Sequence, residues 1–266
     1  MIKKIIHSLH ILGYRRFQRL FERLFMISLT GMNIGTAGLI YDDGELGVLE
    51  YVRKKECGGD LVIFDVGANV GHYTQALLEH FNEKTRIYSF EPSKKTFVML
   101  SKNIGADTAG AQRVRLQNIG FGNKEETLTL FSDTDNSGLA SVYKRKLDHQ
   151  NVFLDKTESI AVTTIDNFCQ KNGITKIDLL KMDVEGHELK VLEGAERMIR
   201  DGSISYIQFE FGGNNIDSRT FFRDFYYLLK DQFNIYRVVK DGLYPMTEYK
   251  EAYECFFCST FFAEKK

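Results

Sequence analysis

The chain has 266 residues, 43% of them hydrophobic and 21 of them phenylalanine, which is enough for one large α/β domain with or without appendages. Its formal net charge of −1 argues against a general nucleic-acid-binding protein. Two prolines in all, and no repeat or low-complexity tract, exclude a disordered or repetitive class.

Residues 1–26 form a basic amphipathic segment whose lysines and arginines are accompanied by a single acid, Glu22. Apolar residues recur at helical spacing, which predicts one helix or two helices divided at Gly13. The pattern suits attachment to an anionic membrane surface or a partner, but we favour a helix that packs on the domain. Arginines interrupt the apolar positions, so neither a bilayer span nor a signal peptide is expected. We divide the chain into a helical extension with its Gly-rich loop, residues 1–44, and one domain, residues 45–266.

From residue 45 onward, helices and strands alternate. After a helix at 45–55, the main strands are expected at 61–66, 86–90, 113–119, 177–183 and 204–211. Further helices are expected at 72–81, 93–103, 164–172, 187–200 and 219–231, the last with Ser218 as its N-cap. Short strands are expected at 126–131 and 159–162, and a final antiparallel pair at 234–239 and 254–262. The predicted fold is a doubly wound, mostly parallel seven-stranded sheet with an antiparallel last strand.

Residues 61–71, LVIFDVGANVG, have the pattern of a nucleotide-binding strand, turn and helix. The apolar strand meets an acid at Asp65, and Gly67 and Gly71 follow where the backbone has to approach a ligand closely. Glu91 lies twenty residues after Gly71, the interval at which an acid reaches the ribose hydroxyls in dinucleotide folds. The alternative for Glu91, an acid at the start of the next helix, does not explain this interval.

The glycine spacing and the acid distinguish between nucleotides. A dinucleotide loop has the pattern GxGxxG, whereas three residues separate Gly67 from Gly71. A carboxylate at Asp65 would repel a pyrophosphate and attract an ammonium or sulfonium. S-adenosylmethionine has both cations, a ribose and no phosphate, so it fits better than NAD. After the third strand, Asn118 could hydrogen-bond the adenine edge, and Ile119 or Phe121 could pack on its face; a plain strand-end turn is the equal alternative.

The densest polar cluster follows the fourth main strand, in the stretch KMDVEGHE at 181–188. Strand alternation and the turn that follows put Asp183 and Glu185 on the same side. A solvated acidic helix start explains Glu188 but not Asp183, which ends a buried strand. Glu210 ends the fifth strand among apolar neighbours, so it has to be paired or functional.

Four blocks resemble, in order, the FkbM-type family of S-adenosylmethionine-dependent methyltransferases: LVIFDVGANVGHYT, YSFEPS, IDLLKMDVEGHELKVLEGAERMI and YIQFEF. The resemblance runs from about residue 44 to residue 262 and leaves the extension outside. It implies a class I methyltransferase fold and, typically, O-methylation of hydroxyls on sugars or natural products. The positions of this chain that match the family are Asp65, Gly67, Asn69, Gly71, Glu91, Asp183, Glu185 and Gly186.

The methyl transfer to a hydroxyl that this resemblance implies needs a collinear donor and acceptor and a group that accepts the proton. The candidates for that group are Asp183, Glu185, His187 and Glu210. We expect Asp183 nearest to the methyl group, and Glu185 and Glu210 orienting hydroxyls or acting as base. His187 is expected to act as base or to cap its helix. The three acids would also suit Mg²⁺ or Ca²⁺, which we rank below metal-free acid–base chemistry.

Two other functions are weaker interpretations. A nicotinamide-dependent oxidoreductase is disfavoured by the glycine spacing and by Asp65, and a non-catalytic binding module by the intact Glu91. The acceptor, a hydroxyl of a glycan or small molecule, is expected to meet the variable segments: the N-terminal helix, 132–156, 212–219 and 242–253.

The four cysteines do not form the pattern of a disulfide framework, and no secretory signal precedes them. Cys255 and Cys258 have CxxC spacing, but no second pair of zinc ligands lies nearby in the sequence. We interpret both as small residues of an apolar strand, and we expect a reducing, cytoplasmic environment.

Overall fold

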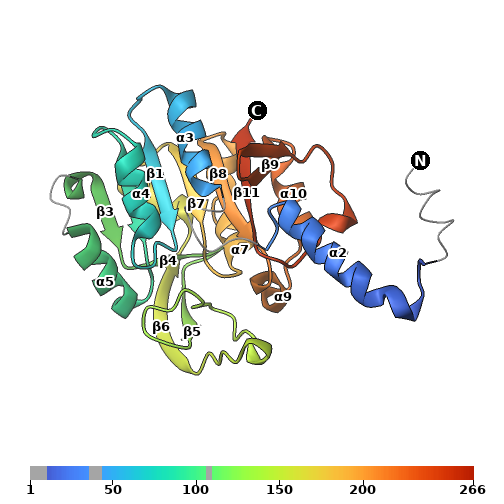
Figure 1. Cartoon of the computed structure of the whole chain (residues 1–266). Coiled ribbons are helices and arrows are strands. Elements are labelled where there is room, and N and C mark those ends of the chain that lie inside the picture. Colours follow the sequence, from blue (N-terminus) through green and yellow to red (C-terminus); the bar gives the residue numbers. More distant parts are fainter. Residues whose placement is uncertain (1–10, 36–43, 106–109) are drawn as a thin grey trace.

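The computed structural model describes residues 11–35, 44–105 and 110–266, and its centre is an eight-stranded sheet (Figure 1). Its strands are β1 (Val62–Val66), β2 (Arg86–Phe90), β3 (Val114–Gln117), β7 (Ile177–Met182), β8 (Ile204–Phe211), β9 (Phe233–Val239), β10 (Gly242–Pro245) and β11 (Ser259–Lys265). The spatial order is β10-β9-β11-β8-β7-β1-β2-β3. The strands from β3 to β8 in this order pair in parallel, and β11 lies antiparallel between β8 and β9. This topology confirms the predicted class I methyltransferase fold.

Strand β10 is one strand more than the seven predicted. It forms a hairpin with β9, in which Gly242 pairs with Val239 across a loop of two residues. The Asp241-Gly242 dipeptide at the end of this loop is typical of hairpins. It overlaps the start of the segment 242–253, which is expected at the acceptor pocket.

Helices cover both faces of the sheet, and strand alternation sorts the side chains into two cores. Ile63 packs with α3, α4 and α5 on one face, and Phe64 packs with α6, α7, α8 and α10 on the other. The helices are α3 (Glu45–Glu56), α4 (His72–His80), α5 (Lys94–Gly105), α6 (Ile165–Asn172), α7 (Glu188–Glu193), α8 (Glu196–Arg200), α9 (Asn214–Ser218) and α10 (Phe222–Leu229). Short 3-10 turns are η1 (Arg15–Phe17), η2 (Ala111–Arg113), η3 (Asp148–Gln150) and η4 (Glu251–Tyr253).

The helix predicted at 187–200 is interrupted and forms α7 and α8. At the break, the Gly194 carbonyl accepts a hydrogen bond from the Asp166 N–H (3.0 Å). The Asp166 carboxylate in turn accepts from the N–H groups of Arg197 (2.8 Å) and Met198 (3.0 Å). A residue of α6 therefore caps α8, and this tertiary contact overrides the local helical pattern.

The N-cap predicted at Ser218 is wrong, because Ser218 ends the short helix α9. Helix α10 begins at Phe222, whose N–H donates to the Glu254 carboxylate at 2.8 Å. Since Glu254 serves this helix, it does not extend the last strand, and β11 begins at Ser259 instead of residue 254.

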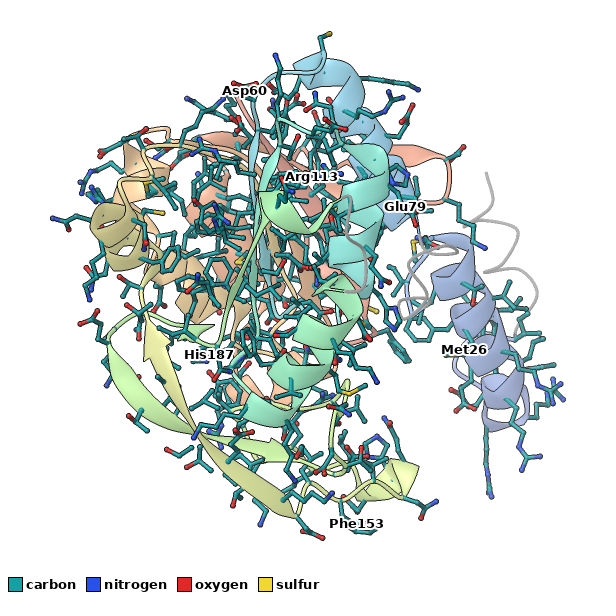
Figure 2. The ribbon with its side chains drawn as sticks, turned by 90° about the vertical axis from the view of Figure 1, so that its left-hand side faces the viewer. Met26, Asp60, Glu79, Arg113, Phe153 and His187 are labelled. Carbon is teal, nitrogen blue, oxygen red and sulfur yellow. The ribbon has the colours of Figure 1, made fainter. Side chains whose placement is uncertain are left out.

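A second sheet lies beside the carboxyl ends of β1, β2 and β7, in the lower part of Figure 1. Its strands are β4 (Gly120–Phe121), β5 (Glu126–Ser132) and β6 (Lys156–Thr163), in the order β4-β6-β5. Strands β5 and β6 confirm the two short strands predicted. The strand predicted at 113–119 is shorter, because the chain leaves the main sheet after Gln117 and enters the second sheet as β4. The connection from β5 to β6 extends to Phe153 at the far end of the molecule (Figure 2).

The N-terminal extension contains the helix α2 (Gln18–Gly31). Figures 1 and 2 both show it standing at the side of the domain. Leu29 is its one buried residue, and the Phe25 ring contacts the ring of Phe257, so the helix packs on the domain only near its C-terminal end and the predicted packing is confirmed only there. The rest of the predicted helical segment, residues 1–10, lies outside the described residues. Among the described helices, none has the length and apolar character that crossing a membrane requires.

Candidate active site

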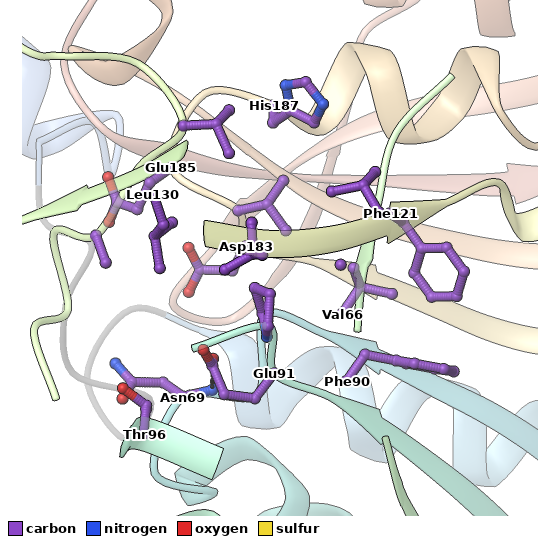
Figure 3. Close-up of a pocket in the computed structure, with 18 of the residues that line it drawn as sticks. Val66, Asn69, Phe90, Glu91, Thr96, Phe121, Leu130, Asp183, Glu185 and His187 are labelled. Carbon is purple, nitrogen blue, oxygen red and sulfur yellow. Dashed lines mark hydrogen bonds between the residues drawn. The ribbon is translucent and has the colours of Figure 1, made fainter. Parts of the chain in front are cut away.

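A cavity opens at the carboxyl ends of β1, β2 and β7 and is roofed by the second sheet (Figure 3). Seven of the eleven residues predicted for the site line it: Gly67, Asn69, Glu91, Ile119, Asp183, Glu185 and His187. Four do not: Asp65, Gly71, Asn118 and Glu210. The carboxyl ends of parallel strands meet at one edge, which explains why residues so distant in sequence converge.

Gly67 lets the turn after β1 pass directly against the turn after β7. Its φ is +81°, and a Cβ at this position would collide with the backbone carbonyl oxygen of Asp183. The Gly67 and Ala68 N–H groups donate to the Phe90 carbonyl, at 3.0 and 2.9 Å. Gly71 has a different role from the one predicted, because it precedes α4 with a φ of +100° and packs against Leu100 of α5.

Glu91 and Asn69 form the polar wall of the cavity (Figure 3). The Glu91 carboxylate accepts from the N–H groups of Ser93 (2.8 Å) and Asn69 (3.1 Å). Burial raises the pKa of Glu91 to about 7, against the effect of these two donors. The Asn69 side-chain oxygen is buried without a hydrogen-bond partner in the described chain. The wall therefore offers a carboxylate and an unsatisfied amide oxygen to a ligand that donates hydrogen bonds.

Asp65 lies behind this wall, which corrects the expectation that its carboxylate faces a cationic ligand. It is fully buried and shares the sheet face of Ile63, beneath α4. Its carboxylate accepts from the Thr74 hydroxyl at 2.6 Å and lies 3.5 Å from the Lys181 ammonium. The cation beside Asp65 is thus one of the protein's own side chains.

Lys181 is a buried cation beside the site that the sequence analysis missed. Its ammonium lies 3.5 Å from a carboxylate oxygen of Asp65 and 3.5 Å from one of Asp183, and it stands over the Tyr73 ring. Burial lowers the pKa of Lys181, but the Asp183 and Asp65 carboxylates outweigh it and hold the pKa above its usual value. The sequence pattern that could have revealed it is a lysine within the otherwise mostly apolar strand IDLLKM. A lysine in a buried strand requires an acidic partner nearby.

Asp183 and Glu185 lie on the turn after β7. The Asp183 carboxyl is about one-third exposed (36%) at the cavity wall. Glu185 has a left-handed backbone with φ of +52°, and Arg145, from the connection between β5 and β6, forms an ion pair with its carboxylate. Burial and the Asp183 carboxylate raise the pKa of Glu185 to about 8, against the charge of Arg145. The connection between β5 and β6 and the turn after β7 are therefore joined by a largely buried ion pair.

Glu188 holds this turn together from within. Its carboxylate accepts from the N–H groups of Val184 (3.0 Å) and Gly186 (3.2 Å), and its other oxygen is buried without a partner. Burial raises the pKa of Glu188 to about 7 despite these donors. The interpretation of Glu188 as a solvated acid at a helix start is wrong.

The raised pKa of Glu188 predicts a dependence of stability on pH. An acid whose pKa rises from 4.5 to about 7 on folding stabilises the fold below pH 4.5, and this stability is lost as the pH rises through 7. In Glu188→Gln, the free energy of unfolding from urea titrations should therefore fall less steeply between pH 5 and 7, by up to about 1.4 kcal/mol per pH unit. The exposed Glu196→Gln serves as the control. If the free energy of unfolding depended on pH equally in wild type and Glu188→Gln, the raised pKa of Glu188 would be contradicted.

His187 lies against the second sheet. Its Nδ1 is 3.0 Å from the Tyr143 hydroxyl, and a Cβ added to Gly122 would come within 2.9 Å of its Nε2. Burial, with the nearby charge of Lys190, lowers the pKa of His187 to about 4. Although it occupies the N-cap position of α7, its side chain makes no capping hydrogen bond. A neutral imidazole in the cavity wall results.

Glu210 lies outside the cavity lining, at the end of β8. The Cys258 thiol donates to its carboxylate at 3.0 Å. Burial and the Asp183 carboxylate raise the pKa of Glu210 well above its usual value. Cys258 and Cys255 precede β11 and do not lie within a strand as predicted.

Asn118 supports the site from outside the cavity. Its amide nitrogen donates to the backbone carbonyls of Glu91 (2.8 Å) and Pro92 (3.0 Å), so it fixes the turn that carries Glu91. The neighbouring Ile119 and Phe121 do line the cavity. They are joined by apolar side chains of the second sheet and of the connection between β5 and β6 that the sequence analysis did not include: Leu130, Val142, Ile160 and Val162. They give the cavity an apolar end opposite its polar wall. Across the residues that the structure describes, no cluster of three or more His, Cys, Asp or Glu side chains is arranged to hold a metal ion.

Several curated proteins similar to this chain are named as methyltransferases. The 2-O-methyltransferase NoeI of Sinorhizobium fredii is 25% identical over 56% of this chain and 63% of its own length. The hexuronic acid methyltransferase AglP of Haloferax volcanii is 27% identical over 64% of each chain. The matches therefore span less than two thirds of either relative.

Among solved structures, an O-methyltransferase from Bacillus cereus in complex with SAH is 12% identical, with a TM-score of 0.47 over 100% of this chain and 97% of that one. The methyltransferase FkbM from Methylobacillus flagellatus is 17% identical, with a TM-score of 0.45 over 77% of this chain and 44% of that one. The sequence profile of the Methyltransferase FkbM domain matches residues 65–236. This match covers more than half of the chain and includes the turns after β1, β2, β7 and β8. The chain therefore belongs to the FkbM methyltransferase family.

Proposed function

We propose that this protein transfers a methyl group from S-adenosylmethionine to a hydroxyl oxygen of a sugar, glycan or other small molecule. The observation that carries the proposal is one cavity with three features: a carboxylate on its polar wall, an apolar end, and an acidic turn between them. The relatives NoeI and AglP, named as methyltransferases of a 2-hydroxyl and of a hexuronic acid, support a sugar-type acceptor. We assign the activity to residues 45–266.

The cavity residues fit S-adenosylmethionine. Both Glu91 oxygens accept one backbone N–H each and keep lone pairs for the two ribose hydroxyls. The unsatisfied oxygen of Asn69 is a further acceptor. Ile119 and the apolar side chains of the second sheet suit an adenine ring. The exposed carboxylate next to the cavity is that of Asp183, which would attract a sulfonium and repel the pyrophosphate of NAD.

The acids of the β7 turn then supply the chemistry. S-adenosylmethionine, when bound, provides an electrophilic methyl group. Asp183, which Lys181 keeps paired and which reaches the cavity, orients the acceptor hydroxyl and takes its proton. Glu185, which lines the cavity and is held by its ion pair with Arg145, orients further hydroxyls of the acceptor, whereas Glu210 lies outside the lining and is assigned no contact with the acceptor. His187 shapes the wall beside Tyr143.

We propose that the reaction takes place in the cytoplasm, and the four free cysteine thiols support such a reducing environment.

Three of the variable segments expected at the acceptor pocket can be compared with the site. The connection between β5 and β6 reaches it through Arg145, and α9 reaches it through Asn214, whose amide lies 3.5 Å from the Glu185 carboxylate. The segment 242–253 begins with the edge strand β10, which the three strands β9, β11 and β8 separate from β7. We therefore assign acceptor recognition to the first two.

The test is the binding of S-adenosylmethionine to wild type and Glu91→Gln, measured by calorimetry. We expect the variant to bind about ten- to a hundred-fold more weakly, because hydrogen bonds to an ionised carboxylate are lost. Since the pKa of Glu91 is about 7, wild-type affinity should rise as the pH increases through 7, and the variant should lack this component. The exposed Glu196→Gln is the matched control, and NAD should not bind. Equal affinities of wild type and Glu91→Gln would overturn the ribose assignment.

A further inference from the structure

Helix α2 presents an apolar face that the described chain leaves uncovered. Leu20, Leu24 and Ile27 are 47%, 46% and 67% exposed. Their spacing of four and three residues places them on one side of the helix. Apolar side chains scattered singly over a surface are ordinary, but three in one helical row form a continuous strip.

The opposite side of α2 is attached to the domain near its C-terminal end. Leu29 is 2% exposed there, and Phe25, although 51% exposed, has its ring 6.4 Å from the ring of Phe257. Beyond the helix, the Asn33 amide donates to the Val238 carbonyl at 3.2 Å, and the Gly35 N–H donates to the Cys258 carbonyl at 2.8 Å. The C-terminal end of the helix is thus anchored beside β9 and β11, which fixes the direction of the free strip.

Arginines accompany this strip. Arg23 lies four residues before Ile27 in α2, so it projects on the same side as the apolar residues, and Arg19 lies further round the helix. Arg15 and Arg16 belong to the 3-10 turn η1 before the helix, where the Arg16 guanidinium stands over the rings of Tyr14 and Phe17. None of these four arginines forms an ion pair with a described acid, and Glu22 is the single acid of the helix. Exposed guanidinium groups beside exposed Leu and Ile are complementary to a surface with anionic groups above a hydrocarbon layer.

We propose that α2 docks on the surface of a membrane that contains anionic lipids, with Leu20, Leu24 and Ile27 in the acyl boundary and the arginines among the phosphates. In both views the helix stands at the side of the domain, and Figure 1 shows it running outward from beside α10, on another side of the molecule than the second sheet that roofs the cavity. A membrane on this face leaves the cofactor cavity accessible. An interface between two copies of this chain through the same strip would bring the arginines of both copies together, and the repulsion between like charges would weaken it.

The test is co-sedimentation of the full chain with vesicles of phosphatidylcholine alone or mixed with phosphatidylglycerol. Wild type should bind the mixed vesicles, more weakly as salt increases, and the neutral vesicles far less. Arg16→Ala with Arg23→Ala should lower the partition coefficient by roughly 30-fold. Leu20→Ser with Ile27→Ser should lower it by about a hundred-fold.

Matched controls are the exposed Val98→Ser on α5 and Arg200→Ala on α8, which should bind vesicles like wild type. Calorimetry with S-adenosylmethionine should give wild-type affinity for every variant, so that failure of the fold or of the proposed function is recognised separately. Absence of binding to the mixed vesicles, or equal losses in the control variants, overturns the proposal. So does a lipid-free dimer, seen by sedimentation equilibrium, that Leu20→Ser with Ile27→Ser abolishes, since the strip would then be a self-interface.

Discussion

Replacing Asp183 by asparagine lowers kcat by about 10²–10⁴-fold, the usual contribution of a positioned general base. Asp183 is the acid that both lines the cavity and keeps a substantial exposed fraction. Glu185 is engaged with Arg145, and Glu210 lies outside the lining with the Cys258 thiol on its carboxylate. Asp183 is therefore the cavity carboxylate best placed to take the proton of the acceptor hydroxyl, because its pairing with Lys181 leaves it partly exposed at the cavity wall. The amide of asparagine keeps the shape of the side chain but cannot take that proton.

The measurement is transfer of a labelled methyl group from S-adenosylmethionine to a hydroxyl acceptor, with the affinity for S-adenosylmethionine determined in parallel. Affinity should change far less than kcat, and the exposed Asp201→Asn should behave like wild type. Turnover should also survive EDTA, since the proposed chemistry needs no divalent ion. A wild-type kcat for Asp183→Asn would assign the proton to another group.

Lys181→Met destabilises the fold by about 3–5 kcal/mol, the cost of leaving buried charges without their partner. Asp65 is fully buried, and one of its carboxylate oxygens has no hydrogen bond in the described chain, so the Lys181 ammonium at 3.5 Å is its compensating charge. Asp183 loses the same partner. Methionine fills a similar volume, so the effect reports the charge and not a cavity.

Urea unfolding of the single variant and of Lys181→Met with Asp65→Asn separates the two causes. Removing the orphaned carboxylate should restore a large part of the lost free energy of unfolding. Lys102→Met on α5, an exposed position, is the control for the substitution itself. A double variant as unstable as the single one would show that Lys181 stabilises the fold by packing alone.

The sequence was sufficient for the parts of the site that depend on strand order and spacing. The twenty-residue interval from Gly71 to Glu91 placed Glu91 at the polar wall, and the end of β7 placed Asp183 beside it. Both predictions follow from one rule, that the ends of parallel strands meet at one edge. The edge strand β10 and the break between α7 and α8 were missed, because a short hairpin and a cap by Asp166 are small signals beside strong helical and strand periodicity.

The sequence could not predict which face of a strand a side chain occupies when both faces of that strand are buried. Strand β1 is apolar on both faces, so the pattern could not tell that Asp65 points beneath α4 while Val66 points into the cavity. For the same reason Lys181 escaped notice, although it neutralises Asp65. The apolar end of the cavity comes mainly from the second sheet. No local sequence pattern predicts that this sheet lies beside the carboxyl ends of the main strands.

A crystal structure of the complex with S-adenosylhomocysteine tests the central claim most directly. It should show the ribose hydroxyls within hydrogen-bond distance of the Glu91 carboxylate and the adenine against Ile119 and the second sheet. The sulfur should face the turn that carries Asp183. A ligand bound elsewhere, or bound in this cavity with its ribose away from Glu91, would contradict the account.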